Sequence, residues 1–81
     1  MVKPDDGGEV SPEKVRHGFS LVLEVDPNEV GLGDDFFLLG GHSLMVVLLV
    51  RYLASEGIIV RPKDVFDGRT PSRIAKVARH C

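Results

Sequence analysis

The sequence predicts a small all-α protein with one aliphatic core. The chain has 81 residues, the usual length of a single domain. It is 43% hydrophobic but only 6% aromatic, with no tryptophan, and this composition favours the aliphatic core of a helical bundle. Three segments carry helix signals, namely cap residues, an initial proline or a long run without helix breakers.

The first helix is predicted to begin at Pro12, with Ser11 as its N-cap. Apolar residues then recur at i, i+4, i+7 and i+8, which predicts one buried face: Val15, Phe19, Val22 and Leu23. The pair Asp26–Pro27 should end this helix, because proline restricts the residue before it and has no N–H for the next hydrogen bond. Residues 1–10 are polar and are predicted to form a disordered lead-in to a domain spanning residues 11–81.

Residues 26–42 form a long connection without a sustained hydrophobic period. Loops of this length are usually functional or disordered. Apolar side chains should hold this one against the core: Val30, Leu32, Phe36, Phe37 and Leu39. Gly40 and Gly41 then allow the backbone to turn where a Cβ would clash. Asp35, in the same stretch, is expected to be a solvated loop acid.

Ser43 is predicted to cap a second helix, which runs without proline or glycine from Leu44 to Glu56 and ends before Gly57. One side of this helix suits a core: Val46, Leu49, Val50 and Leu53. The opposite side, which should face water, also begins with apolar residues: Leu44, Val47 and Leu48. An apolar patch that the core does not use is typical of a docking surface.

The last third of the chain predicts two shorter elements. Residues 58–60 suit an extended segment, and residues 62–66 fit one short helical turn. Thr70 and Pro71 repeat the cap-then-proline start and predict a final helix that includes Arg79 in its last turns. Its inward residues should be Ile74, Ala75 and Ala78.

The charges exclude some functions and leave two interpretations of the surface. The formal net charge is −2, which argues against a nucleic-acid partner. Nine of the 12 acidic residues precede Phe36, whereas seven of the 10 basic residues follow Val50. This asymmetry fits either a solvated bipolar surface or an acidic partner on the C-terminal half.

No segment predicts a membrane anchor or a disulfide framework. The apolar run from Leu44 to Val50 is far shorter than the ~20 residues that a membrane span needs. The first ten residues lack the apolar region of a signal peptide, and Cys81 is the only cysteine. We therefore expect a monomeric cytoplasmic protein. Both a free-standing protein and a domain cut from a longer chain would look like this.

Ser43 does not fit a hydrolase or a phosphate-binding loop. A nucleophile elbow has the pattern G-x-S-x-G, and Met45 occupies the second glycine position. The phosphate-loop pattern needs a lysine, and none lies between Lys14 and Lys63. The paired spacing of a metal site is missing from the possible ligands His17, His42, His80 and Cys81. The sequence therefore predicts neither a catalytic nor a metal-binding residue.

One chemical role does suit Ser43. Unpaired backbone N–H groups at a helix N-terminus favour an attached anion, so a phosphate ester on this hydroxyl would be stabilised there. Gly40 and Gly41 would leave room for an incoming enzyme. The alternative is that Ser43 only caps the helix.

The segment "DDFFLLGGHSL", Asp34 to Leu44, resembles the modification motif of carrier-protein domains, in particular peptidyl carrier (thiolation) domains of nonribosomal peptide synthesis. The resemblance extends from "SPEKV" to "VFDGRTPSRIAKVA". It implies a four-helix bundle with a short third helix, in which Ser43 receives 4′-phosphopantetheine from coenzyme A through a magnesium-dependent phosphopantetheinyl transferase. The thiol of this arm would hold an amino acid or peptide that an adenylation enzyme loads and condensation or tailoring enzymes use. The carrier itself would catalyse nothing.

The resemblance also implies where these partners dock: Gly41, His42, Leu44, Val47, Leu48, Val65 and Phe66. His42 stands where fatty-acid and polyketide carriers usually have aspartate, which favours the peptidyl type. Leu38 and Leu48 stand where the family mostly has polar or charged residues, through neutral drift or to suit one dedicated partner. The other hypotheses are an acyl carrier of polyketide or fatty-acid type and an unmodified helical interaction module.

Overall fold

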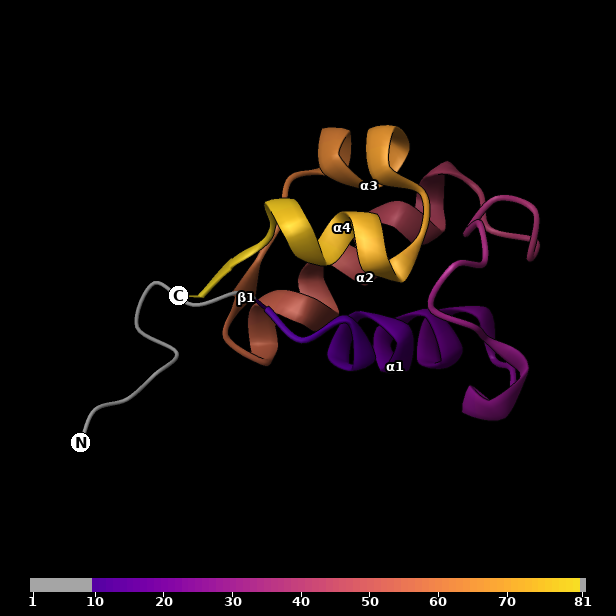
Figure 1. Cartoon of the computed structure of the whole chain (residues 1–81). Coiled ribbons are helices and arrows are strands. Elements are labelled where there is room, and N and C mark those ends of the chain that lie inside the picture. Colours follow the sequence, from indigo (N-terminus) through magenta and orange to yellow (C-terminus); the bar gives the residue numbers. More distant parts are fainter. Residues whose placement is uncertain (1–9, 81) are drawn as a thin grey trace.

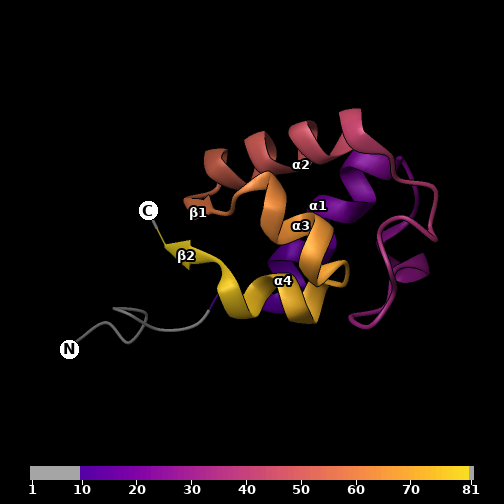
Figure 2. The same cartoon turned by 90° about the horizontal axis from the view of Figure 1, so that it is seen from above.

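The computed structural model describes residues 10–80, which form four helices and one short β-pair (Figures 1 and 2). In chain order the elements are α1 (Pro12–Leu23), the 3₁₀ turn η1 (Pro27–Glu29), α2 (Ser43–Ser55), β1 (Ile58–Ile59), α3 (Pro62–Gly68), α4 (Pro71–Val77) and β2 (Arg79–His80). Helix α1 contacts both α2 and α4, and α3 contacts α2 and α4. The predicted four-helix bundle, with a short third helix and a long loop before α2, is confirmed.

The helix starts follow their sequence signals. Ser11 caps α1 by accepting a hydrogen bond from the Glu13 N–H at 3.2 Å. Thr70 caps α4 in the same way, accepting from the Arg73 N–H at 3.2 Å. A proline occupies the first turn of both helices, where its missing N–H has no intrahelical acceptor to lose. These two boundaries were therefore predictable from local chemistry alone.

Outside α2, three predicted boundaries are wrong. Helix α1 ends at Leu23 because Glu24 adopts a left-handed conformation (φ 59°), and Asp26–Pro27 instead starts η1. Helix α4 ends at Val77, so Arg79 lies in β2 rather than in a helical turn. Val10, assigned to the disordered lead-in, is buried in the core. The rest of that lead-in, residues 1–9, and residue 81 lie outside the described residues.

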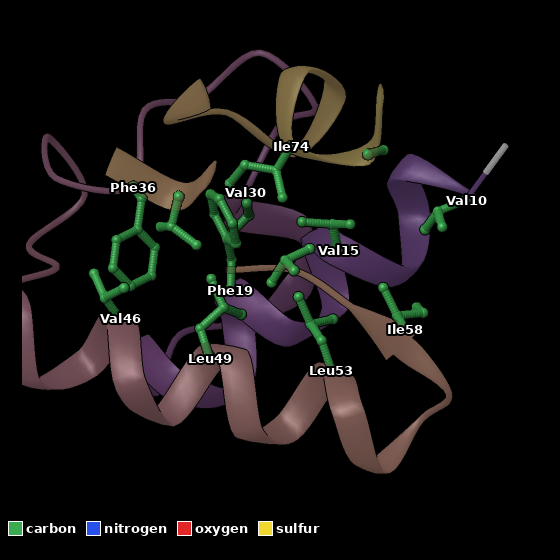
Figure 3. Close-up of a cluster of buried hydrophobic side chains, with 13 residues drawn as sticks. Val10, Val15, Phe19, Val30, Phe36, Val46, Leu49, Leu53, Ile58 and Ile74 are labelled. Atoms are coloured by element: carbon green, nitrogen blue, oxygen red, sulfur yellow. The ribbon is translucent and has the colours of Figure 1, made fainter. Parts of the chain in front are cut away.

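The core is aliphatic with two phenylalanines, and Figure 3 shows its side chains converging from α1, α2 and the long loop. Helix α2 contributes Val46, Leu49 and Leu53, the face that the sequence predicted. Helix α1 contributes Val15 and Phe19. The remaining members come from the segments around these helices: Val10, Val30, Phe36, Ile58, Val60, Val65, Ile74 and Ala75. These residues form one contiguous cluster, as expected of a chain of this length.

A two-residue antiparallel pair joins the end of the chain to the segment after α2. Ile58 pairs with His80, and Ile59 pairs with Arg79. Residues 58–59 are extended as predicted, but their partner strand was assigned to the last helix. This pair lies at the opposite end of the bundle from the long loop (Figure 1). The loop and the start of α2 therefore share the other end.

Phe36 fixes the end of the long loop against the bundle. Its ring is fully buried and packs edge-on against Phe19, with 4.9 Å between the ring centroids. The Gly41 N–H donates to the Phe36 carbonyl at 3.0 Å, which closes the turn before α2. A Cβ on Gly41 would lie 2.5 Å from Cδ2 of Phe36, so only glycine fits beneath the ring.

We expect Gly41→Ala to lower the free energy of unfolding by roughly 1–3 kcal/mol, because the buried Phe36 ring must shift to accept the new methyl group. Urea denaturation at neutral pH measures this change. Gly33→Ala is the matched control, since nothing lies within 4 Å of a Cβ at that position. Equal stabilities for the two variants would contradict the packing argument.

Candidate functional site: Ser43 at the start of α2

Ser43 is the first residue of α2, and its side chain is exposed. His42 occupies the N-cap position in an extended conformation (φ −144°, ψ 179°) and makes no side-chain cap hydrogen bond. Its carbonyl accepts the first helical hydrogen bond, from the Val46 N–H at 3.1 Å. The prediction that Ser43 caps the helix is therefore wrong by one position. Its hydroxyl has no hydrogen-bond partner among residues 10–80 and is open to modification.

The first turn of α2 favours a negatively charged group on Ser43. The backbone N–H groups of Ser43, Leu44 and Met45 precede the first helical hydrogen bond, so the helix itself offers them no acceptor. The first turn also contains no acidic residue that would repel an anion. The residues present therefore suit a phosphodiester on the Ser43 oxygen, which is the linkage that phosphopantetheine makes.

The loop before Ser43 is held by Asp35, which the sequence had suggested to be a solvated acid. One carboxylate oxygen accepts from the Phe37 and Leu38 N–H groups, at 2.8 and 3.2 Å. The other accepts from Nε of Arg69 at 2.5 Å. The hydrogen bond from Arg69, joined by those from the two N–H groups, holds the pKa of Asp35 below its ordinary value of 3.8 despite partial burial. Asp35 therefore has a structural role, because it forms an ion pair with Arg69.

Apolar side chains surround the serine on the solvent side. Leu44 is 65% exposed, and Val47 and Leu48 are about half exposed on the same side of α2. Leu38, in the preceding loop, is 84% exposed. The predicted apolar face of α2 outside the core is therefore present, beginning beside Ser43. Such a surface in water is the usual mark of protein contact.

The predicted docking residues separate into exposed and covered ones. His42 and the three α2 residues are exposed, and Phe66 of α3 is 44% exposed. Val65 is fully buried in the core, so assigning its side chain to docking is wrong. It faces inward because α3 is a single short helix whose inner side must cover the bundle. Gly41 is half-buried beneath the Phe36 ring, and since it has no side chain it could contribute to docking only through the shape of the backbone.

The role of Arg69 in holding the loop was not predicted from the sequence. Its carbonyl accepts from the Phe36 N–H at 2.7 Å, and its guanidinium lies 5.2 Å from the centroid of the Phe37 ring. Arg69 has a positive φ of 70°, which turns the chain at the end of α3. No local sequence signal marks the contacts of Arg69 with the loop. The turn itself is a common motif, in which an aspartate side chain, here that of Asp35, accepts a hydrogen bond from the backbone N–H two residues later. Within residues 10–80 no group of three possible metal ligands occurs.

A comparison with protein families matches residues 13–78 to the family described as "Phosphopantetheine attachment site". Among curated proteins, D-lysergyl-peptide-synthetase subunit 1 of Epichloe festucae var. lolii is 31% identical over 77 residues, 95% of this chain and 2% of that protein. Nonribosomal peptide synthetase 5 of Gibberella zeae is 32% identical over 71 residues, 88% of this chain and 1% of that protein. The chain thus spans only a few hundredths of the length of these relatives.

Solved structures share the fold. A structure titled "Non Ribosomal PCP domain" superposes with a TM-score of 0.77 at 26% identity, covering 99% of this chain and 95% of that one. A thiolation-reductase di-domain from an archaeal nonribosomal peptide synthetase gives a TM-score of 0.75 at 35% identity, covering 82% of this chain and 14% of that one.

The bundle, with an uncapped serine hydroxyl at the start of α2, defines a carrier-protein domain. More particularly, the chain belongs to the phosphopantetheine-attachment family, and its relatives are nonribosomal peptide synthetases. The family is defined by covalently attached 4′-phosphopantetheine, and its domains generally carry groups without catalysis of their own. These matches favour the peptidyl carrier over the unmodified interaction module. In the described part of the chain, no helix is long and apolar enough to cross a membrane.

The ion pairs of the fold make its stability depend on pH. The hydrogen bond from Arg61 lowers the pKa of Asp64, as that from Arg69 lowers the pKa of Asp35. A carboxylate whose pKa is lower in the folded than in the unfolded state stabilises the fold at pH values above its unfolded-state pKa. This stabilisation is lost as the pH falls through the folded-state pKa.

We therefore expect Asp35→Asn to lower the melting temperature at pH 7, and we expect its gap from wild type to narrow as the pH falls below 3.8, the ordinary pKa of an aspartate, and Asp35 becomes protonated. Differential scanning calorimetry across this range measures the gap. Glu29→Gln removes one exposed carboxylate of η1 and controls for the change in net charge. A gap for Asp35→Asn that stays constant with pH would show that its ionisation is not linked to folding.

Proposed function

We propose that Ser43 carries 4′-phosphopantetheine and that the thiol of this arm holds an aminoacyl or peptidyl group as a thioester. The observation that supports this most directly is the free hydroxyl of Ser43 at the first helical position of α2. A capping serine would have its oxygen engaged by a backbone N–H, whereas here no residue of the described chain engages it. The exposed oxygen can reach the active site of a separate enzyme.

In the attachment step the Ser43 oxygen bonds to the pantetheine-side phosphorus of coenzyme A. The bond from that phosphorus to the bridging oxygen breaks, the nucleotide part leaves with it, and the hydroxyl proton passes to a base of a magnesium-dependent phosphopantetheinyl transferase. The chain's contribution is to hold the hydroxyl outward at a helix end that favours the new negative charge. Family membership supports the nature of the arm.

The arm would deliver its cargo to the active sites of other enzymes. Two hollows, of about 290 and 430 Å³, lie along α3 and α4, and neither is lined by Ser43. The proposed partners are an adenylation enzyme that loads the thiol and condensation or tailoring enzymes that use the thioester. The names of the relatives support a nonribosomal peptide or related pathway. We place this pathway in the cytoplasm, as expected from the sequence.

The apolar residues beside Ser43 suit the docking of these enzymes. Leu44, Val47 and Leu48 extend along α2 from the serine, and Phe66 adds an aromatic ring from α3. Large apolar and aromatic side chains at the centre of an interface dominate binding energy. We infer that Leu48, where the family often has a polar or basic residue, adapts this surface to one dedicated loading enzyme.

We expect a gain of one phosphopantetheine on the peptide containing Ser43 when the protein is incubated with coenzyme A, magnesium and a broad-specificity phosphopantetheinyl transferase. Intact and peptide mass spectrometry measures it. Ser43→Ala should gain nothing, whereas Ser55→Ala, which removes a hydroxyl from the other end of α2, should react like wild type. No gain on folded wild-type protein would refute the proposal.

We expect Leu48→Arg to slow loading of the holo protein by roughly tenfold, since replacing an apolar contact with a charge costs an interface about 1–2 kcal/mol. Modification of Ser43 and the melting temperature should stay unchanged, because the side chain is half exposed. Rates of aminoacyl thioester formation with the cognate adenylation enzyme test this. Ala54→Arg places the same charge on a different side of α2 and should load normally. Equal loading rates for wild type and Leu48→Arg would show that Leu48 does not take part in docking the loading enzyme.

A further inference from the structure

The segment between Asp35 and Ser43 is bound to the end of α3 by several contacts of different kinds. The ion pair between Asp35 and Arg69 joins residues 34 positions apart. Backbone hydrogen bonds run from the Phe36 N–H to the Arg69 carbonyl, at 2.7 Å, and from the Ser72 N–H to the Leu32 carbonyl, at 3.0 Å. The loop is thus tied both to the α3–α4 turn and to the start of α4.

Aromatic contacts reinforce the same junction. The Phe37 ring stacks on the Phe66 ring of α3, with 5.4 Å between centroids and 13° between planes. The Arg69 guanidinium lies 5.2 Å from the Phe37 centroid, within the range of a cation–π contact. We call the set Asp35, Phe37, Phe66 and Arg69 the clasp. Its members come from the loop and from α3 with its C-cap, and none comes from α2.

A continuous hydrogen-bonded turn connects the clasp to Ser43. The Leu39 N–H donates to the Asp35 carbonyl, the Gly40 N–H to the Phe37 carbonyl, and the Gly41 N–H to the Phe36 carbonyl, at 3.0–3.1 Å. Only His42 separates this turn from Ser43. The position of the loop relative to α3 therefore determines the path by which the chain enters α2.

We propose that Arg69 and Asp35 are positioning residues for the modification of Ser43, because they hold the loop in the one conformation that a phosphopantetheinyl transferase binds. This inference rests on the proposed function of Ser43. Asp35 is well placed for the part, because its side chain is only 17% exposed and one oxygen caps the turn while the other meets Arg69. Arg69 is 48% exposed, so its replacement leaves no buried cavity.

Beyond the stability that the ion pair contributes to the fold, the clasp acts on the population of loop conformers. The core beneath it includes Phe36 together with residues of α1 and α2, and neither Asp35 nor Arg69 belongs to that core. Without Arg69 the loop samples other conformers, and only the fraction in the bound form is recognised. The apparent affinity of the transferase then falls in proportion to that fraction, whereas the bound complex reacts at the same rate.

The test is the steady-state kinetics of Ser43 modification, with carrier concentration varied. We expect Arg69→Gln to raise KM for the carrier by roughly tenfold with kcat unchanged, and Arg69→Lys to recover most of the loss, since it keeps the cation near the carboxylate and the ring. Amide hydrogen exchange at Gly40 and Gly41 should accelerate in Arg69→Gln by more than exchange at the core amides of α1 and α2. A merely structural role would lower the melting temperature without this pattern.

Arg73→Gln is the matched control, because it makes the same chemical change on α4, where the side chain is exposed and lines a hollow away from Ser43. It should leave KM unchanged. Asp35→Asn breaks the same ion pair from its other side and supplies a second variant, and the double variant should show no larger rise in KM than either single change. A KM within twofold of wild type in both single variants, or an equal rise in Arg73→Gln, overturns the proposal. Absence of modification in wild type would overturn the proposed function itself.

Discussion

The burial of the Phe36 ring is the contact on which the candidate site depends. The ring fills the space between Phe19 of α1 and the backbone at Gly41, so it joins the long loop to the core at the point where the loop turns into α2. This anchor and the contacts of the loop with the end of α3 together place the chain that leads into Ser43. A long connection would otherwise leave Ser43 at the end of a loosely held segment. The ring makes it part of the folded domain.

Much of this arrangement could be predicted from the sequence, because the signals are local. Cap residues and prolines mark the starts of α1 and α4, and the apolar period of α2 marks its buried side. The same helical spacing predicted the exposed apolar side that begins at Leu44. For the site, the motif from Asp34 to Leu44 is sufficient to select Ser43 as the candidate residue.

What could not be predicted depends on tertiary contacts. The end of α1 is set by a left-handed Glu24, which no glycine or proline announces at that position. The pairing of Ile58 with His80 and the ion pair of Asp35 with Arg69 each join residues far apart in the chain. Val65 was assigned to the surface because α3 borders the docking face in the family, but a single short helix must use its apolar residue for the core. The one-residue shift at Ser43 arises because His42 already has the extended backbone of a cap.

Helix α2 has two apolar sides, one buried in the core and one exposed to solvent. Val46, Leu49 and Leu53 are enclosed by other elements of the same chain, so a change of volume there alters the fold. Leu44, Val47 and Leu48 touch solvent, and the fold tolerates many residues at these positions. If the exposed residues form the docking surface proposed above, recognition and stability are encoded at separate positions of one helix. Such a domain can diverge toward a new partner through a few substitutions without first acquiring extra stability to compensate for them.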